Sequence, residues 1–319
     1  MYLAEDTWID KRVALKIPHR QNLDFGELLR EPRLLASLNH PNIVTVITAE
    51  KQDNVFFIVM EYVPGETLEN LIATRGALEI ATVLDYTCQI ANAVEHAHKQ
   101  GVIHRDLRPA NVFVTDKGLL KVGDFGTSRF LEIAAHGTTV IGSPPYMAPE
   151  QFEGRAVFAS DLYSLGVTMY QMLTGELPYD TPAPADLDRL RRGELVRPPR
   201  SRNPQVPQSV NEIVMRALAG AVTERYQRAE DLLHDILTVR KSIVRNQTGT
   251  TGLSAETRRA KAETTGLNVS DPGQIDAPAR GPAAPAVRSR EVAASRFCWN
   301  CRKPLPSRAG KCPFCGENQ

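Results

Sequence analysis

The first part of the chain alternates apolar segments with short polar turns. Residues 2–17 predict two strands joined by a polar turn, and the apolar run 55–63 predicts a buried strand with a polar exit. Residues 24–38 instead carry apolar positions near helical spacing, after which HPNIVTV enters another strand. We therefore expect a small sheet and one helix up to residue 63.

Two longer helices are expected further along the chain. Residues 79–99 place one apolar stripe on a single helical face, and Cys88 lies near that stripe as core packing. Residues 160–174 are apolar almost all round, so this helix should be buried, with Ser160 as its N-terminal cap. Both helices are therefore expected to contribute to a packed core.

Between these helices, residues 112–122 predict a short hairpin around an Asp-Lys-Gly turn. An H-R-D triplet ending at Asp106 precedes it, with Asn111 five residues further on, and a D-F-G triplet beginning at Asp124 follows it. Because a hairpin holds its two ends side by side, these three side chains can converge. Phosphoryl transfer needs such a set, since one carboxylate accepts the hydroxyl proton and a carboxylate with an amide can hold magnesium.

Composition limits the classes of protein to consider. The 319 residues allow about two domains, and 42% hydrophobic with 24% charged residues is ordinary for a soluble globular protein. A net charge of +1 offers no electrostatic argument for nucleic acid or membrane binding. The sequence contains neither an apolar run long enough to span a bilayer nor an N-terminal signal core, so we expect a cytosolic protein.

Residues 243–296 change character, with Thr, Ala, Pro, Gly and Arg dominant, and predict a disordered linker. A TTGL motif occurs there twice, at 250–253 and 264–267. Phosphorylation of these threonines would create docking sites for a phosphothreonine reader such as a forkhead-associated domain. Low sequence complexity explains the repeat equally well.

The last residues, 297–319, hold two C-x-x-C motifs separated by ten residues. Their thiolates suit a tetrahedral zinc ion, and the segment resembles a short zinc ribbon, with the four cysteines Cys298, Cys301, Cys312 and Cys315 as ligands. Disulfides are the alternative, which a reducing compartment disfavours. Four protein ligands leave no open position for chemistry, so this zinc would be structural. The ribbon would recruit a partner or fold the tail, and nucleic-acid binding is unsupported.

The combination of H-R-D-L-R-P-A-N with D-F-G resembles the catalytic and metal-binding loops of protein kinases. Residues 1 to about 242 are similar to bacterial-type Ser/Thr protein kinases. The resemblance implies a two-lobed α+β fold with an N-lobe over 1–62 and a C-lobe over 63–242. It further implies ATP and magnesium in the cleft and transfer of the γ-phosphoryl to Ser or Thr hydroxyls of protein substrates.

The same resemblance assigns roles around the reacting phosphate. Asp106 would be the catalytic base, and Asn111 and Asp124 would hold magnesium. Lys16, in V-A-L-K, would hold the nucleotide phosphates and pair with Glu31. A proline at 32 follows that glutamate immediately, so its helix is either kinked or begins there. Arg108 stands where Ser/Thr kinases normally have lysine, with the charge retained.

Nucleotide-binding positions also follow from the resemblance. Ala14 belongs to the strand of Lys16, Met60 would be the gatekeeper behind the adenine pocket, and Glu61 to Val63 would form the hinge whose backbone bonds adenine. A core strand followed by a loop is the plainer interpretation of the same residues.

The segment after D-F-G is similar to a kinase activation segment ending in A-P-E at Glu150. Thr138 and Thr139 stand where bacterial Ser/Thr kinases phosphorylate themselves, although both could simply be solvated loop residues. Arg105 would read such a phosphate through a charge-assisted fork. G-S-P-P-Y at 142–146 favours Ser/Thr specificity.

Two structural roles are implied as well. Asp161 would brace the catalytic loop, and Arg225 would pair with Glu150.

The sequence departs from the family at its beginning, because no G-x-G-x-x-G-x-V loop precedes the first strand. Residue 1 matches the position just after the last loop glycine. We expect an internal GTG to have been taken as the start, with about 20–30 further residues upstream that restore the loop. The alternative function is a pseudokinase scaffold that binds partners through its lobes and ribbon. In-frame translation of the DNA upstream distinguishes the two, because a stop codon without such a loop favours the scaffold.

Overall fold

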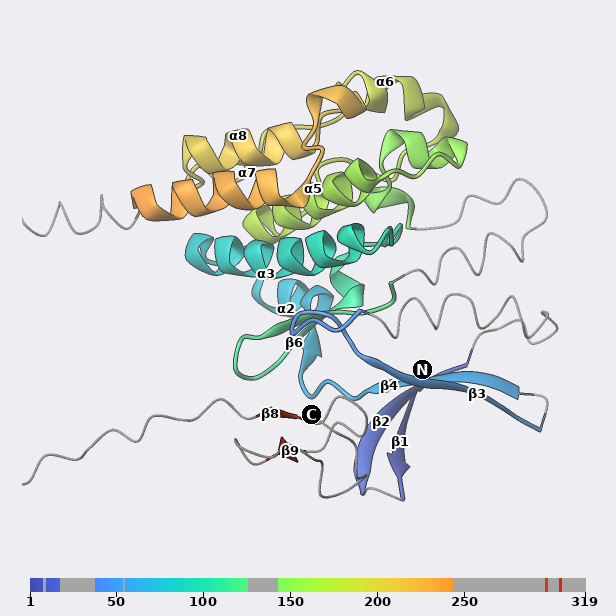
Figure 1. Ribbon diagram of the computed structural model, residues 1–319. Coiled ribbons are helices and arrows are strands. Elements are labelled where there is room, and N and C mark those ends of the chain that lie inside the picture. The colour runs from blue at the N-terminus through green and yellow to red at the C-terminus, as the bar shows by residue number, and fades with distance from the viewer. Residues whose placement is uncertain are drawn as a thin grey trace, which may run out of the picture. The chain divides into compact units, whose positions relative to one another are not determined.

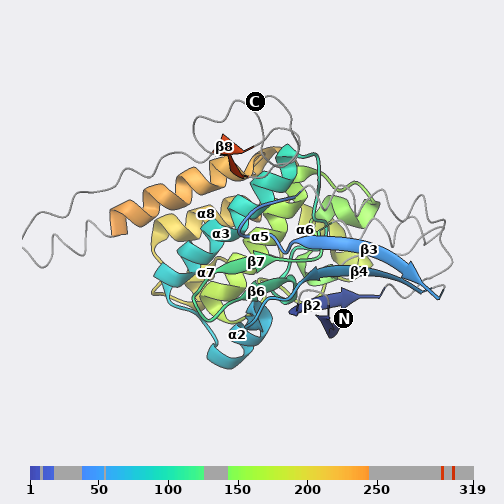
Figure 2. The same ribbon diagram turned by 60° about the horizontal axis from the view of Figure 1, so that its bottom comes forward.

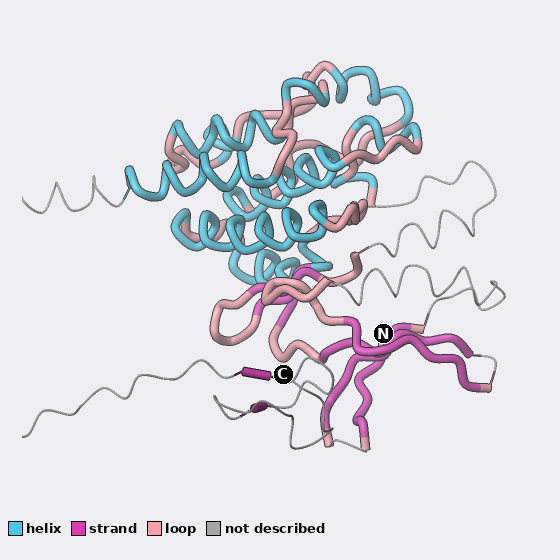
Figure 3. The backbone as a smooth tube through the Cα atoms, in the orientation of Figure 1, coloured by secondary structure: helices cyan, strands magenta, loops and turns pink. Residues whose placement is uncertain are grey.

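The computed structural model describes residues 1–7, 10–17, 38–53, 55–125 and 143–243, together with two short strands near the C-terminus. The chain divides into two compact units, Met1–Lys261 and Ala262–Gln319. The first combines a sheet with a helical part (Figures 1 and 3). In the second, β8 (Arg296–Phe297) pairs antiparallel with β9 (Pro304–Leu305).

The N-terminal sheet has four antiparallel strands in the order β1-β2-β4-β3. Their bounds are β1 Tyr2–Asp6, β2 Lys11–Lys16, β3 Val46–Gln52 and β4 Val55–Glu61. Alternate residues of β4, namely Phe56, Ile58 and Met60, are buried and form a small core with Val44. The strands predicted over 2–17 and 55–63 are thereby confirmed.

The strand predicted in HPNIVTV begins later than expected, at Val46. The preceding Ile43 makes an isolated parallel bridge to Val122 instead, and Val44 donates its N–H to the Val122 oxygen at 2.9 Å. This segment pairs with a strand outside the N-terminal sheet, which no local pattern indicates. The helix predicted over 24–38, with Glu31 and its following proline, lies outside the described residues except for Leu38, which is buried.

The rest of the first unit is mainly helical (Figure 1). The helices are α2 Leu68–Arg75, α3 Ile80–Lys99, α5 Phe158–Thr174, α6 Leu187–Arg191, α7 Pro199–Arg202, α8 Gln208–Ala217 and a helix over 229–243. Short 3-10 helices occupy Pro109–Asn111, Pro144–Tyr146, Pro149–Glu153, Pro184–Asp186 and Val222–Glu224. Nearly every residue of α5 is buried, as its apolar pattern predicts. Among the described helices, none has the length and apolar content to cross a membrane.

The predicted cap of α5 is wrong. The helix begins at Phe158 with Val157 as its cap, so Ser160 lies in the first turn. Its hydroxyl accepts the Val157 N–H at 3.0 Å and donates to Glu150 Oε1 at 2.6 Å. From its place in the first turn, Ser160 therefore accepts the N–H of the cap residue Val157 and also donates to the distant carboxylate of Glu150.

The predicted hairpin is confirmed as β6 (Val112–Val114) and β7 (Leu120–Val122). A short strand β5 (Glu66–Thr67) adds to β6, giving a three-stranded sheet in the order β5-β6-β7. Gly118 has φ +74° in the turn, a conformation that suits glycine. β7 lies close to α3 (Figure 2), so the hairpin rests on the helical part of the unit.

The helices α5 and α8 approach each other closely at Gly166, so a larger side chain there is expected to destabilise the protein. A Cβ added there would lie 2.8 Å from Ala217 Cβ and 3.2 Å from Leu218 Cδ2. Gly166→Leu should therefore lower the free energy of unfolding by roughly 1–3 kcal/mol through overpacking. Helix propensity alone predicts the opposite sign, a gain of roughly 0.5–1 kcal/mol. Urea denaturation decides between them.

The matched control is Thr238→Leu, at an exposed position of the helix over 229–243. Its effect on the free energy of unfolding should stay within about 0.5 kcal/mol. A Gly166→Leu variant as stable as the parent protein would show that the two helices do not pack as closely as described.

Candidate active site

The loop 104–111, between α3 and β6, is fixed by the buried carboxylate of Asp161. Its Oδ2 accepts the His104 N–H at 2.8 Å and its Oδ1 accepts the Arg105 N–H at 2.9 Å. Arg105 has φ 69°, a left-handed conformation that costs a non-glycine residue on the order of 1–3 kcal/mol. The two bonds hold the chain in this conformation, so the predicted brace from Asp161 is confirmed.

His98, near the end of α3, also reaches the Asp161 carboxylate, with its Nε2 2.7 Å from Oδ2. Sequence reasoning gave this histidine no role. Its neighbours in sequence are ordinary last-turn residues of a helix, and only the fold brings Asp161, 63 residues away, against it. His98 therefore helps to hold the Asp161 carboxylate that fixes the loop.

His104 joins the loop to the strand that precedes Asp124. Its imidazole is fully buried, its Nε2 lies 2.9 Å from the Gly123 oxygen, and its ring centroid lies 4.5 Å from that of Phe125. On the other side, Gly123 donates its N–H to the Asn111 oxygen at 2.8 Å. The two ends of the hairpin are thus joined directly, as the sequence predicts.

Asp106 and Asn111 face each other across this loop. Asn111 Nδ2 donates to the Asp106 main-chain oxygen at 2.8 Å and to its Oδ2 at 3.2 Å. Within the described residues, Asp106 Oδ1 is buried and receives no hydrogen bond. Arg108 Nε lies 4.0 Å from Asp106 Oδ2, beyond hydrogen-bond distance but close enough for electrostatic attraction. Oδ2 of Asp106 is therefore held by Asn111, while Oδ1 can still accept a hydrogen bond.

Asp124 lies two residues beyond the end of β7 and pairs with Lys16 at the end of β2, with Lys16 Nζ 2.7 Å from Asp124 Oδ1. Asp124 has φ 60°, so it shares the left-handed conformation of Arg105. The predicted partner of the lysine, Glu31, lies outside the described residues. The structure thus brings a cation and a carboxylate together beside Asp106 and Asn111.

The donor atoms present here suit magnesium. Asn111 uses its Nδ2 on Asp106, which leaves its Oδ1 as the amide atom for a cation. That oxygen and the Asp124 carboxylate are hard oxygen ligands of the kind Mg²⁺ prefers. Among the described residues no cluster of three or more His, Cys, Asp or Glu side chains forms a denser metal site.

An apolar cavity of about 200 Å³ lies beside Asp124. Four of the predicted nucleotide-binding positions line it, namely Ala14, Met60, Glu61 and Val63, together with residues that include Val44 and Phe113. The carboxylate of Glu61 is engaged elsewhere, since it accepts from Lys121 Nζ at 2.6 Å and from Thr45 N–H at 2.9 Å. The cavity therefore offers apolar walls and main-chain groups at one edge.

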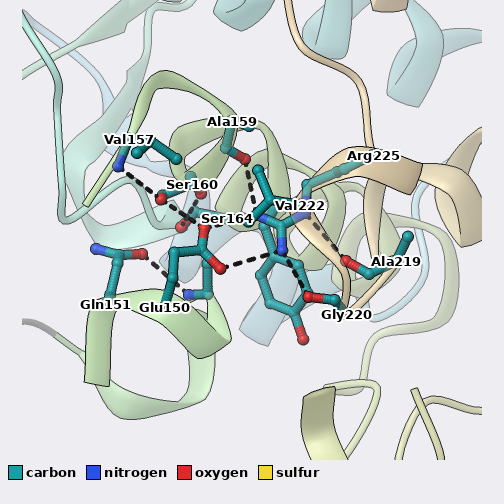
Figure 4. Close-up of polar contacts among 12 residues, drawn as sticks. Glu150, Gln151, Val157, Ala159, Ser160, Ser164, Ala219, Gly220, Val222 and Arg225 are labelled. Atoms are coloured by element: carbon teal, nitrogen blue, oxygen red, sulfur yellow. Dashed lines mark hydrogen bonds and ion pairs between the residues drawn. The ribbon is translucent and has the colours of Figure 1, made fainter. Parts of the chain in front are cut away.

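A buried ion pair joins the A-P-E triplet to the segment before the helix over 229–243 (Figure 4). Arg225 donates to Glu150 Oε1 at 2.8 Å and Oε2 at 3.2 Å, as predicted, and also to the main-chain oxygens of Ala159, Ala219 and Gly220. Burial alone would raise the pKa of Glu150, but its bonds to Arg225 and Ser160 outweigh burial and lower that pKa. The Arg225 guanidinium also lies 4.8 Å above the Tyr163 ring. With every donor engaged, the pair can remain charged inside the protein.

Several predicted residues fall outside the part of the chain that the structure describes. They are Glu31, Thr138, Thr139 and the four cysteines Cys298, Cys301, Cys312 and Cys315. Arg105, the predicted reader of a loop phosphate, is described and half-buried.

Comparison with known proteins places this geometry in a family. A family model described as "Protein kinase domain" matches residues 1–242. The chain is 36% identical over 248 residues to a probable serine/threonine-protein kinase of Clostridium perfringens, 38% over 246 residues to the serine/threonine-protein kinase PrkC of Bacillus subtilis, and 34% over 254 residues to PknB of Mycolicibacterium smegmatis. These alignments cover 75–76% of this chain but span only 36–40% of the relatives' length.

A solved structure shares the fold. The crystal structure of Rad53 1-466 in complex with AMP-PNP matches with a TM-score of 0.61 at 26% identity, covering 72% of this chain and 59% of that one. The chain therefore belongs to the protein kinase domain family, and its kinase domain is of the bacterial serine/threonine type.

Proposed function

We propose that this chain is a serine/threonine protein kinase that transfers the γ-phosphoryl of ATP to hydroxyl groups of protein substrates. The observation that carries the proposal is the hydrogen-bonded frame around Asp106, Asn111, Asp124 and Lys16. The names of the relatives and the AMP-PNP bound to Rad53 support it. The kinase domain would span 1–242, with an N-lobe over 1–62, a C-lobe over 63–242 and a linker over 243–296.

Asp106 is the proton acceptor in this proposal. Its Oδ2 is held by Asn111 at 3.2 Å, so the carboxylate keeps one orientation, and its Oδ1 receives no hydrogen bond within the described residues. A substrate hydroxyl that approaches Oδ1 finds a buried acceptor. Arg108 stabilises the negative charge nearby. A positioned base of this kind typically contributes ~100- to 10,000-fold to the rate.

The phosphates would be held by Lys16, with Asn111 and Asp124 holding magnesium. The ammonium of Lys16 lies 2.7 Å from Asp124 Oδ1, so a phosphate bound beside Asp124 would come within its reach. Glu31 would steady the lysine from the neighbouring helix. Bound magnesium would neutralise charge that develops on the phosphoryl oxygens.

The adenine ring would occupy the apolar cavity beside Asp124. Ala14 and Met60 supply its walls, with Met60 as the gatekeeper, and the backbone of Glu61 to Val63 supplies hydrogen bonds at its edge. The Glu61 N–H is bonded to the Thr45 oxygen at 3.0 Å, so the proposed bonds to adenine come from the Glu61 carbonyl and from Val63. Flat apolar walls with a few polar groups at one edge are typical of a cofactor pocket.

Autophosphorylation of the activation segment would regulate the site. Thr138 and Thr139 are the proposed acceptors, and Arg105 reads the phosphate. The Arg105 backbone is fixed by Asp161 directly beside Asp106, so a phosphate held by its side chain would order the segment next to the base.

The C-terminal segment 297–319 would be a structural zinc ribbon. The strands β8 and β9 pair with each other, and the six residues that connect them contain the first C-x-x-C motif, at Cys298 and Cys301. A hairpin that closes over one such motif is a common way to present two thiolates to zinc, and Cys312 and Cys315 would complete the tetrahedron.

Partners and location follow from the same proposal. The TTGL repeats of the linker would serve as docking sites for a phosphothreonine-reading protein such as one with a forkhead-associated domain. The protein would act in the cytoplasm on protein substrates, without nucleic acid or membrane.

Asp106→Asn is expected to reduce phosphoryl transfer by ~100- to 10,000-fold, because an amide cannot accept the hydroxyl proton. The free energy of unfolding should hardly change, since an amide fills the same space. Steady-state turnover with Mg-ATP measures the first quantity and urea denaturation the second. Asp188→Asn, at an exposed position of α6, is the matched control and should keep full turnover. Near-normal turnover of the Asp106 variant would remove Asp106 as the base.

Replacing both Thr138 and Thr139 by alanine should lower the rate on an external protein substrate, because Arg105 then has no loop phosphate to bind. Mass spectrometry of the parent protein should find phosphate on one of these threonines. Thr74→Ala, on the exposed side of α2, is the control. An unchanged rate in the double variant contradicts this regulation.

The tail should contain one zinc ion per chain by elemental analysis of protein purified under reducing conditions. Structural zinc can supply ~10–16 kcal/mol of apparent binding free energy to so small a module, so a chelator should unfold the tail and leave the kinase domain folded. Cys301→Ser should lose the metal, whereas Cys88→Ala, at the buried cysteine of α3, should retain it. Absence of zinc from the parent protein refutes the ribbon.

A further inference from the structure

The outer half of the hairpin β6–β7 is held by a side-chain amide of α3. Gln89 Oε1 accepts the Leu120 N–H at 2.8 Å, and its Nε2 donates to the Gly118 oxygen at 3.1 Å. The same Nε2 donates to Asp85 Oδ2 at 3.0 Å, one turn earlier in α3. Gln89 thus bonds the turn and the first residue of β7 together, while Asp85 fixes its own orientation.

A second amide meets Gln89 from the segment that precedes β3. Asn42 is buried, and its Nδ2 donates to Gln89 Oε1 at 3.0 Å and to the Leu120 oxygen at 2.9 Å. The main-chain oxygen of Asn42 also accepts the Val122 N–H at 2.8 Å. Both polar groups of the Leu120 backbone are therefore bonded to side chains, one from Gln89 and one from Asn42.

These bonds matter because β7 is short and ends at the proposed magnesium site. It has only three residues, Leu120–Val122, and pairs with an equally short β6. Gly123 follows and donates to the Asn111 oxygen at 2.8 Å, and Asp124 comes next. A displacement of β7 along its axis would therefore move Asp124 and disturb Asn111 at the same time.

We propose that Gln89 is a positioning residue for the magnesium-binding pair Asn111 and Asp124, acting through the register of β7. The inference rests on the proposed function, because that function makes these two side chains the ligands. Gln89 touches neither of them. It contributes by bonding the Leu120 N–H, the Gly118 oxygen and Asn42 from the rigid scaffold of α3.

If Gln89 only stabilised the fold, replacing it would change the stability of the protein but not its metal affinity. Losing the bonds of Gln89 would lower the free energy of unfolding and leave the metal affinity of the folded molecules unchanged. A positioning residue also changes that affinity, because misplaced oxygen ligands fit Mg²⁺ poorly. Metal affinity of folded protein is therefore the quantity that distinguishes the two roles.

The test uses the full chain with Gln89→Met, which keeps the length of the side chain and the helix propensity but removes its polar atoms. The apparent affinity for Mg²⁺ is measured by titrating the metal into protein mixed with a fluorescent non-hydrolysable ATP analogue. We expect a loss of about 10-fold, at the lower end of what mutation of groups supporting metal ligands produces. Hydrogen exchange of metal-free protein should also quicken at the amides of Val122 and Gly123, which Gln89 does not contact.

Two further variants keep the result interpretable. Asn203→Leu, near the end of α7, removes an amide that donates to the Leu173 oxygen at 2.8 Å and accepts the Gln205 N–H at 3.1 Å, far along the chain from the hairpin. It should lower stability without changing Mg²⁺ affinity or exchange at Val122 and Gly123. Gln89→Glu keeps the oxygen that accepts from Leu120 and Asn42, and an added Asp85→Asn replaces a carboxylate 3.0 Å away, which would repel the new charge, by an amide that can donate to it. This double variant should fold and give an intermediate affinity even if the methionine variant does not.

The outcomes separate this inference from the proposed function. Parent protein that binds no Mg-nucleotide contradicts the proposed function. If the parent binds it and both Gln89 variants bind Mg²⁺ equally well, with unchanged exchange, the positioning role is overturned. An equal loss of affinity in Asn203→Leu overturns it too, because general destabilisation would then account for the effect.

Discussion

The carboxylate of Asp161 is the constraint on which the candidate active site depends. It lies in the first turn of the buried helix α5 and accepts the backbone N–H groups of His104 and Arg105. Those two bonds hold Arg105 in a left-handed conformation that costs on the order of 1–3 kcal/mol. Without them the loop would not keep this backbone conformation. Because Asp106 follows directly, the orientation of the proposed base is set by a residue 55 positions away in sequence.

The hairpin joins this braced loop to the metal-binding side. His104 reaches the Gly123 oxygen, and Gly123 reaches the Asn111 oxygen, so the loop and the residue before Asp124 share reciprocal bonds. Lys16 then connects Asp124 to the N-terminal sheet. In this arrangement the side chains that would contact ATP come from separate elements, and backbone and side-chain bonds between those elements hold them in position. Support from residues that do not themselves contact ATP is what phosphoryl transfer requires, because its catalysis consists mainly of positioning and electrostatic stabilisation.

Local patterns in the sequence predict much of this structure. The two strands over 2–17, the hairpin over 112–122 and the apolar helix over 160–174 all depend on neighbouring residues, and each is confirmed. What sequence reasoning missed depends on tertiary contacts. Ser160 has the chemistry of a cap, yet it lies inside the helix, where its hydroxyl accepts the Val157 N–H and donates to the distant Glu150 carboxylate. His98 gives no local signal at all, since its partner is brought to it only by the packing of α3 against α5.

Transfer of phosphate from γ-labelled ATP tests the central claim most directly. Purified chain is incubated with Mg-ATP and a protein substrate, and the labelled product is hydrolysed to identify the modified amino acid. The account predicts acid-stable label on serine or threonine that requires magnesium. Binding of Mg-ATP with no label transferred to protein, or label confined to another side chain, would contradict it.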